Sequence, residues 1–189
     1  MEGFKGVLTN RSAVSCLAGT AFITAAYMAM ASYAPSYYRE QFNLSTSHAT
    51  LVVVGSSIFF ILGTRICGLL VSRFGRKPLM LWPAALAALS IYVYLNVPNI
   101  WFSLAARFLG STFSAIVFTA ANALTLEQVP IYRGTVMSLS QASFSLGGVL
   151  GTGLGGLVVL FSGYEAMGIS HGALMIIAML ILHFFAKES

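Results

Sequence analysis

The polar side chains best placed to act on a solute lie along one face of an otherwise apolar segment, residues 99–126. They recur at offsets of 0, +4, +7, +15 and +18, which is one face of an α-helix: Arg107, Ser111, Ser114, Asn122 and Thr125. A guanidinium there can anchor a carboxylate, while hydroxyl and amide groups can hydrogen-bond a neutral solute. In an apolar segment, such a stripe indicates a helix face that meets protein or water. The alternatives for Arg107 are snorkelling to the outer interface and pairing with a charge from outside the chain.

Two further apolar segments carry candidate cavity residues. Thr20, Thr24 and Tyr27 lie in the first segment, and Gln141 and Ser145 lie in the fifth. For any single serine or threonine, a hydrogen bond to its own helix backbone is the competing interpretation. The third and sixth segments have few polar residues, so we expect them to face lipid.

The sequence has no pattern typical of an enzyme. It contains no Asp, and its five glutamates all lie outside the middle of the apolar segments. His48, His171 and His183 lie near segment ends or on the segments expected to face lipid, which makes them weak proton-relay candidates. We find no metal-ligand spacing and no nucleophile motif, and we expect no cofactor.

The composition indicates an integral membrane protein. Of the 189 residues, 58% are apolar and 8% are charged, and the mean hydropathy is +0.85. An average soluble protein has about 25% charged residues, so this inventory cannot cover a water-exposed surface. The net charge of +5 comes from basic residues near predicted loops, which indicates orientation in a lipid bilayer and not nucleic-acid binding.

The apolar runs predict an all-α bundle of six transmembrane helices in a single domain. We expect a stop at Pro35, an N-cap at Ser45 or Ser47, and a first-turn position for Pro78. The predicted spans are approximately 13–34, 46–71, 78–95, 99–126, 133–161 and 163–185.

The basic residues predict that both termini are cytoplasmic in the cell (inner or plasma) membrane. With that orientation only Arg39 is in an outer loop, and Arg65 and Arg107 fall within helices. The aromatic residues Tyr37, Tyr38, Tyr92, Tyr94, Trp101 and Tyr164 then form a belt at the outer interface. The basic residues on the inside are Lys5, Arg11, Arg73, Arg76, Lys77, Arg133 and Lys187.

The sequence also contains two glycine-containing patterns, a basic turn and a row of small residues. A basic turn between the second and third segments contains Gly68, Ser72, Arg73, Gly75, Arg76 and Lys77. A row of small residues in the fifth segment contains Gly147, Gly151 and Gly155, followed by Gly156. Small-residue rows let helix backbones approach closely, so packing is our interpretation of this row.

These motifs resemble the major facilitator superfamily of secondary transporters. The basic turn is similar to the family signature Gly-x-x-x-Asp-Arg-x-Gly-Arg-Arg/Lys, with Ser72 in place of the Asp. Arg107-Phe-Leu-Gly110, Glu127-x-x-Pro130-x-x-Arg133-Gly134 and Gly151-Thr-Gly-Leu-Gly155-Gly156 resemble later family motifs, the last with Thr in place of a Pro.

The resemblance implies a six-helix half of a twelve-helix transporter, built as a 3+3 inverted repeat. The missing Asp favours the C-terminal half and a weakened cytoplasmic latch, although a plain topology signal explains the basic turn equally well. Transport of a small organic solute would require a second six-helix half or a second copy as partner, which would also hold any coupling site. The polar stripe permits organic anions, sugars or amphiphilic drugs, and the alternative function is a receptor, scaffold or assembly factor that does not transport.

Overall fold

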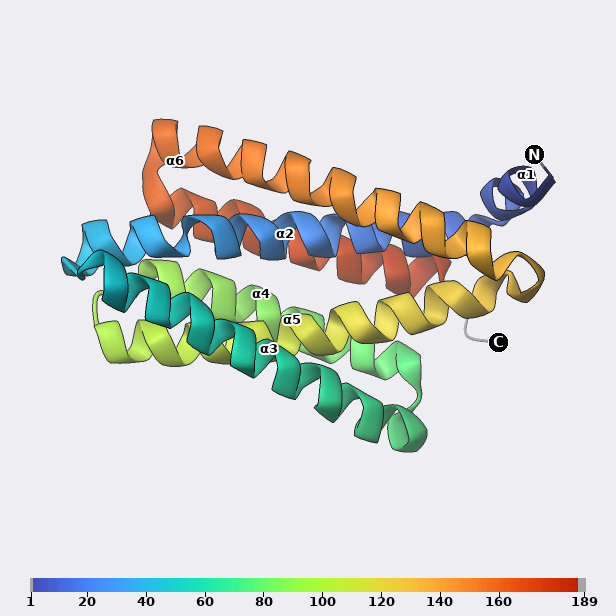
Figure 1. The fold of residues 1–189 in the computed structure, drawn as a ribbon, viewed down its shortest axis with the longest axis horizontal. Coiled ribbons are helices and arrows are strands. Elements are labelled where there is room, and N and C mark those ends of the chain that lie inside the picture. Colours follow the sequence, from blue (N-terminus) through green and yellow to red (C-terminus); the bar gives the residue numbers. More distant parts are fainter. Residues whose placement is uncertain (1, 187–189) are drawn as a thin grey trace.

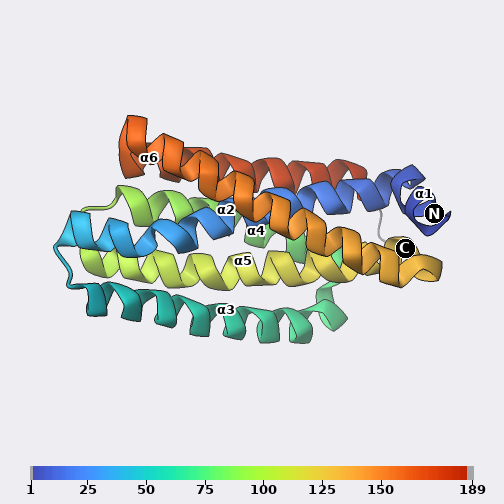
Figure 2. The same ribbon diagram turned by 45° about the horizontal axis from the view of Figure 1, so that its top comes forward.

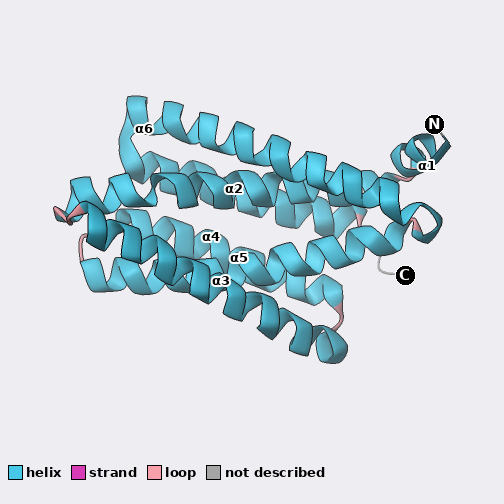
Figure 3. Cartoon of the chain, in the orientation of Figure 1, coloured by secondary structure: helices cyan, strands magenta, loops and turns pink. Residues whose placement is uncertain are grey.

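The computed structural model describes residues 2–186, which form helices joined by short turns and contain no strand (Figure 3). Helices α2 to α6 are each long and apolar enough to cross a membrane, so the protein is an all-α membrane protein. The elements are α1 (Glu2–Thr9), α2 (Arg11–Phe42), α3 (Thr46–Phe74), α4 (Arg76–Asn96), α5 (Ile100–Gln128), the 3-10 turn η1 (Pro130–Tyr132) and α6 (Arg133–Phe185).

Helix α6 consists of two helical parts joined at Gly163. This glycine has φ 78° and ψ −179°, a conformation that residues with a Cβ rarely adopt. The chain doubles back there, so that the second part returns beside α2 (Figure 1). The two parts correspond to the predicted segments 133–161 and 163–185, and α6 ends at the same end of the bundle where α2 begins.

Side-chain caps fix where three helices begin. Asn10 accepts hydrogen bonds from the backbone N–H groups of Ser12 and Ala13 at the start of α2, and Asn99 caps α5 in the same way. Of the two predicted caps for α3, the structure uses Ser45, whose hydroxyl accepts from the N–H of His48 at 3.3 Å. Each cap satisfies N–H groups that have no partner within their own helix.

The predicted helix end at Pro35 is wrong. Helix α2 continues through Pro35 to Phe42 and ends at Asn43, which has the left-handed φ of 53°. Beyond the proline, Tyr37 and Tyr38 are fully buried, and this packing outweighs the loss of one backbone hydrogen bond.

The central element is α2, which contacts both parts of α6 and also α5, while α4 packs between α5 and α6. Helix α3 runs along an edge of the bundle against α5 (Figure 2). The third and sixth segments each pack one face inside the bundle and expose large apolar residues on another, so lipid contact on the exposed face stays a prediction. Both bury a full face, including Leu79 and Met80 of α4 and Met175 of α6, and α3 is more exposed than either. The hydropathy of a segment does not show which of its faces meets another helix.

The predicted aromatic belt divides into an exposed and a buried group, with Tyr164 partly buried between them and donating to Glu40. Tyr92 and Trp101 are exposed, as a belt requires. Tyr37, Tyr38 and Tyr94 are instead buried as one edge-to-face and stacked cluster with ring centroids 5.2–6.2 Å apart. This tyrosine cluster joins α2 to α4.

Candidate functional site

The predicted candidate Arg107 is buried inside the bundle. Its side chain is 4% exposed, and its guanidinium carbon lies 5.4 Å from the ring centroid of Tyr94. No carboxylate among the described residues lies within ion-pair distance of it. The side chain stays within the bundle beside the ring of Tyr94, which lies two residues before the end of α4. A buried cation of this kind is stabilised only in part by an aromatic face.

Three buried polar groups meet around this guanidinium without hydrogen-bond partners. They are Arg107 Nε, the Tyr94 hydroxyl and Ser111 Oγ. We call them the arginine cluster. They line a hollow of about 10 Å³, enough for about one water molecule, together with Tyr27 and Ser114. A buried donor left without a partner costs about 1–3 kcal/mol, so the cluster is poised to bind a polar group.

The end of α4 holds Tyr94 in position over the guanidinium. The backbone carbonyl of Tyr94 accepts hydrogen bonds from the Tyr37 hydroxyl at 2.9 Å and from Ser103 Oγ at 2.8 Å. That carbonyl is free to accept them because the residue four positions on is Pro98, which has no N–H. Side chains of α2 and α5 therefore hold the backbone of α4 at Tyr94.

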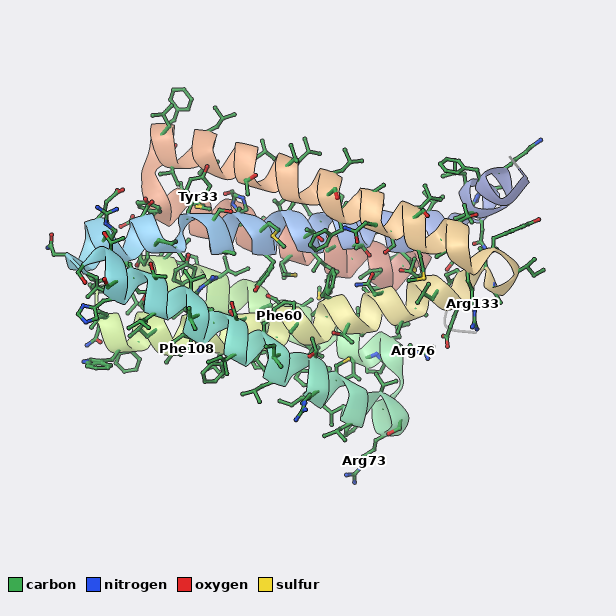
Figure 4. The ribbon with its side chains drawn as sticks, in the orientation of Figure 1. Tyr33, Phe60, Arg73, Arg76, Phe108 and Arg133 are labelled. Carbon is green, nitrogen blue, oxygen red and sulfur yellow. The ribbon has the colours of Figure 1, made fainter. Side chains whose placement is uncertain are left out.

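An aromatic pocket of about 200 Å³ lies beside the arginine cluster, and Tyr27 and Ser114 line both hollows. Its walls come from α2, α3, α5 and α6. Tyr27 and Phe60 have ring centroids 4.8 Å apart, and Phe118 and Phe144 have centroids 5.6 Å apart. Phe60 lies on the side of α3 that faces α5 (Figure 4). The remaining lining residues are Ile23, Thr24 and Met28.

The hydroxyls predicted on α2 form hydrogen bonds within their own helix. Thr20 donates to the carbonyl of Cys16 and Thr24 to that of Thr20, at 2.9 and 2.8 Å. Thr125 of α5 donates to Ala121 in the same manner. Thr24 still lines the aromatic pocket, but with its hydrogen already used. These three threonines therefore hydrogen-bond to the backbone of their own helix, the competing interpretation given above.

The rest of the predicted polar stripe lies elsewhere. Asn122 accepts a hydrogen bond from Ser140 of α6 at 3.0 Å and lines a separate hollow with Gln141. Ser145 is exposed on α6 and lines neither this hollow nor the aromatic pocket. The structure thus brings together Arg107, Ser111, Ser114 and Tyr27, and separates them from Asn122, Gln141 and Ser145.

The glycine row lies at the contact between α6 and α2. A Cβ on Gly147 or Gly151 would collide with the backbone of Ala21 or Ala25. A Cβ on Gly155 or Gly156 would meet the Tyr33 side chain, whose hydroxyl donates to the carbonyl of Thr152 at 3.1 Å (Figure 4).

His171 is buried against this row, which corrects its predicted position near lipid. Its Nε2 lies 3.2 Å from the carbonyl oxygen of Gly151, and its Nδ1 lies 3.0 Å from the Ser170 hydroxyl and 3.2 Å from the carbonyl oxygen of Met167. Gly168 and Gly172, which flank it in the sequence, instead lie against α4, near Leu95 and Ala88.

The basic turn is shorter than predicted and holds an ion pair. Helix α3 ends at Phe74 and α4 begins at Arg76, so only Gly75, with φ 76°, lies between them. Arg76 forms a salt bridge with Glu127 near the end of α5. Arg73 points away from the bundle, and Arg73, Arg76 and Arg133 all lie at one end of it (Figure 4).

The other members of the turn have local roles. Ser72, in the position of the expected Asp, donates to the carbonyl of Leu69 at 3.2 Å. Gly68 is exposed with open space around it, and Lys77 is partly buried in the first turn of α4. Lys187, counted earlier with the basic residues of this end, lies outside the described residues.

Comparison with known proteins places the chain in a family. It matches the Major Facilitator Superfamily over residues 16–189, and it therefore belongs to that family. It is 27% identical over 142 residues to the multi-drug resistance efflux pump PmrA of Streptococcus pneumoniae, covering 75% of this chain and 35% of that protein.

Two further relatives have different printed activities. The proline/betaine transporter of Salmonella typhimurium is 30% identical over 97 residues, covering 50% of this chain and 19% of that protein. The Na(+), Li(+), K(+)/H(+) antiporter of Planococcus maritimus is 22% identical over 186 residues, covering 95% of this chain and 43% of that protein. The chain thus spans less than half the length of each of these relatives.

Proposed function

We propose that this chain is one six-helix half of a secondary transporter for a small organic solute. The observation that carries the proposal is the arginine cluster beside the aromatic pocket. A buried, unpaired cation is costly in a membrane protein and is retained where it meets a solute or a charge. Membership of the Major Facilitator Superfamily, together with relatives named as transporters, supports transport over a receptor or scaffold role.

In this proposal, the six helical segments form a 3+3 inverted repeat, and a second half or a second copy completes the cavity. The match to less than half of each relative named above supports the need for that partner. Ser72 in place of the expected acid favours the C-terminal position. The basic residues gathered at one end of the bundle support an orientation with both termini in the cytoplasm.

Alternating access then moves the solute by rocking one half against the other. At the basic end, the Arg76–Glu127 salt bridge links the start of α4 to the end of α5. The glycine row holds α6 to α2, so this half would move as a unit.

Uptake into proteoliposomes tests the proposal. The protein is expressed from its complete natural coding sequence, purified and reconstituted, and the counterflow of labelled benzoate, proline and glucose is measured. Transport of any of these above empty liposomes supports the proposal. A protein that binds one of them but moves none acts as a receptor, and that result would overturn it.

A further inference from the structure

We infer that the arginine cluster and the aromatic pocket together bind one organic anion, a monocarboxylate that carries a single aromatic ring. The inference rests on the proposed function and names the class of solute. It comes from the chemistry of two adjoining hollows, one lined by unsatisfied donors and the other by aromatic rings.

The first step concerns charge. Arg107, Tyr94 and Ser111 are 4%, 1% and 2% exposed, and each presents a group that can donate a hydrogen bond. No carboxylate among the described residues pairs with Arg107. A guanidinium with neighbouring hydroxyl donors matches the two oxygens of a carboxylate, and a low-dielectric setting strengthens that match.

The second step concerns size and shape. The pocket of about 200 Å³ is walled by Tyr27, Phe60, Phe118 and Phe144. An apolar cavity of about 150 Å³ accommodates benzene, so this pocket suits one substituted ring. The threonine in its wall, Thr24, already donates to Thr20, which leaves the hydroxyls of Tyr27 and Ser114, both shared with the hollow at Arg107, as the other hydroxyl groups of the wall.

The third step joins the two hollows. Tyr27 and Ser114 line both, so a ring in the pocket places a short acidic substituent toward Arg107. One carboxylate oxygen would take the place that about one water molecule can fill, and the rest of the group would lie on the pocket side, next to Tyr27 and Ser114. A cationic solute would meet the guanidinium instead, and like charges in a desolvated site repel.

Binding of a matched ligand series tests the inference. The protein from its complete natural coding sequence is placed in lipid nanodiscs, and equilibrium binding is measured for benzoate, benzamide, benzylammonium and acetate. Benzoate should bind at least about tenfold more tightly than benzamide, the neutral analogue, and than acetate, which lacks the ring. Benzylammonium should bind most weakly. Equal affinity for benzoate and benzamide would overturn the inference.

Two variants locate the site. Arg107→Gln should weaken benzoate binding by about tenfold to a hundredfold and leave benzamide unchanged, because only the charge-assisted contact is lost. The matched control is Arg65→Gln on exposed α3, which should change neither. Phe118→Ala should weaken benzoate and benzamide alike. Benzoate affinity that is unaffected by both Arg107→Gln and Phe118→Ala would refute the assigned site.

The outcome separates the inference from the proposed function. Transport of proline or glucose without selective benzoate binding would support the proposed transport function and refute the inference that the site binds an aromatic monocarboxylate. Selective benzoate binding without transport of any solute would support the inferred anion site and refute the proposed transport function.

Discussion

Helix α2 has two sides, and they are built in opposite ways. One side meets α6, where Gly147 and Gly151 leave no room for a Cβ against the backbone of Ala21 and Ala25. The other side faces α5, where Tyr27 borders both the aromatic pocket and the hollow at Arg107. The first contact is close and satisfied. The second is open and contains donors without partners.

The difference shows how one helix can hold a bundle together and still border a binding site. No buried side-chain polar atom of α2 or α6 lacks a hydrogen-bond partner among the described residues. Even His171, a polar ring inside the α6 contact, uses both nitrogens. The unsatisfied groups gather instead on α4 and α5. The close α2–α6 contact stabilises the bundle. The α4 and α5 side can therefore retain buried donors without partners, which a bound ligand would satisfy.

The largest effect should come from breaking the close side. Gly151→Ala places a Cβ against the backbone of Ala25, which cannot rotate away, and should lower the free energy of unfolding by about 3 kcal/mol. Unfolding by SDS titration in mixed micelles measures it. Gly153→Ala is the matched control, because its Cβ would meet open space. Equal effects of the two variants would mean that the α2–α6 contact is not close-packed.

The next effect should come from the open side, with the opposite sign. Arg107→Met removes a buried cation that has no acidic partner in the described chain, and should raise the free energy of unfolding by about 1–2 kcal/mol. The same titration measures it, with Arg65→Met as control. A clear loss of stability would show instead that Arg107 pairs with an acid supplied by another chain or segment.

A smaller effect is expected from the ion pair at the basic end. Arg76 and Glu127 have side chains 27% and 33% exposed, so their coupling should be below about 1 kcal/mol and should shrink as salt is added. A double-mutant cycle with Arg76→Gln and Glu127→Gln measures it. A coupling free energy of several kcal/mol that does not change with salt concentration would show that this pair is shielded from water in the assembled protein.

The smallest change in stability and in benzoate affinity should come from Gln141, a predicted site residue that the structure places outside the arginine cluster. Gln141→Ala should change both stability and benzoate affinity within experimental error, because Gln141 is exposed and lines a different hollow. Nanodisc binding and SDS titration provide both values. A tenfold loss of benzoate affinity would place the solute near Asn122 instead of Arg107.

The periodicity of the sequence predicted most of the helices and part of the site. Hydrophobic runs and a capping residue such as Ser45 act locally, so they can be recognised from the sequence alone. Arg107, Ser111 and Ser114 share a helix face, and that face does border a hollow. The same periodicity included Asn122, which lies too far along α5 and pairs with Ser140.

The pocket walls could not be predicted in this way. Phe60, Phe118 and Phe144 come from three different helices, and in the sequence they are indistinguishable from core or lipid-facing residues. Tyr94 was predicted as an interface residue, but it is buried, and its backbone carbonyl accepts hydrogen bonds from Tyr37 and Ser103. Such contacts depend on which helices become neighbours.

The sequence by itself determined the membrane class, the approximate spans, the family resemblance and the presence of an arginine within an apolar segment. These follow from composition, spacing and local backbone chemistry. Only the tertiary structure decided that Pro35 lies within a helix, that His171 is buried, and that Arg107 adjoins an aromatic pocket. The physical reason is that burial and partner choice are properties of helix faces brought together, and no single segment contains that information.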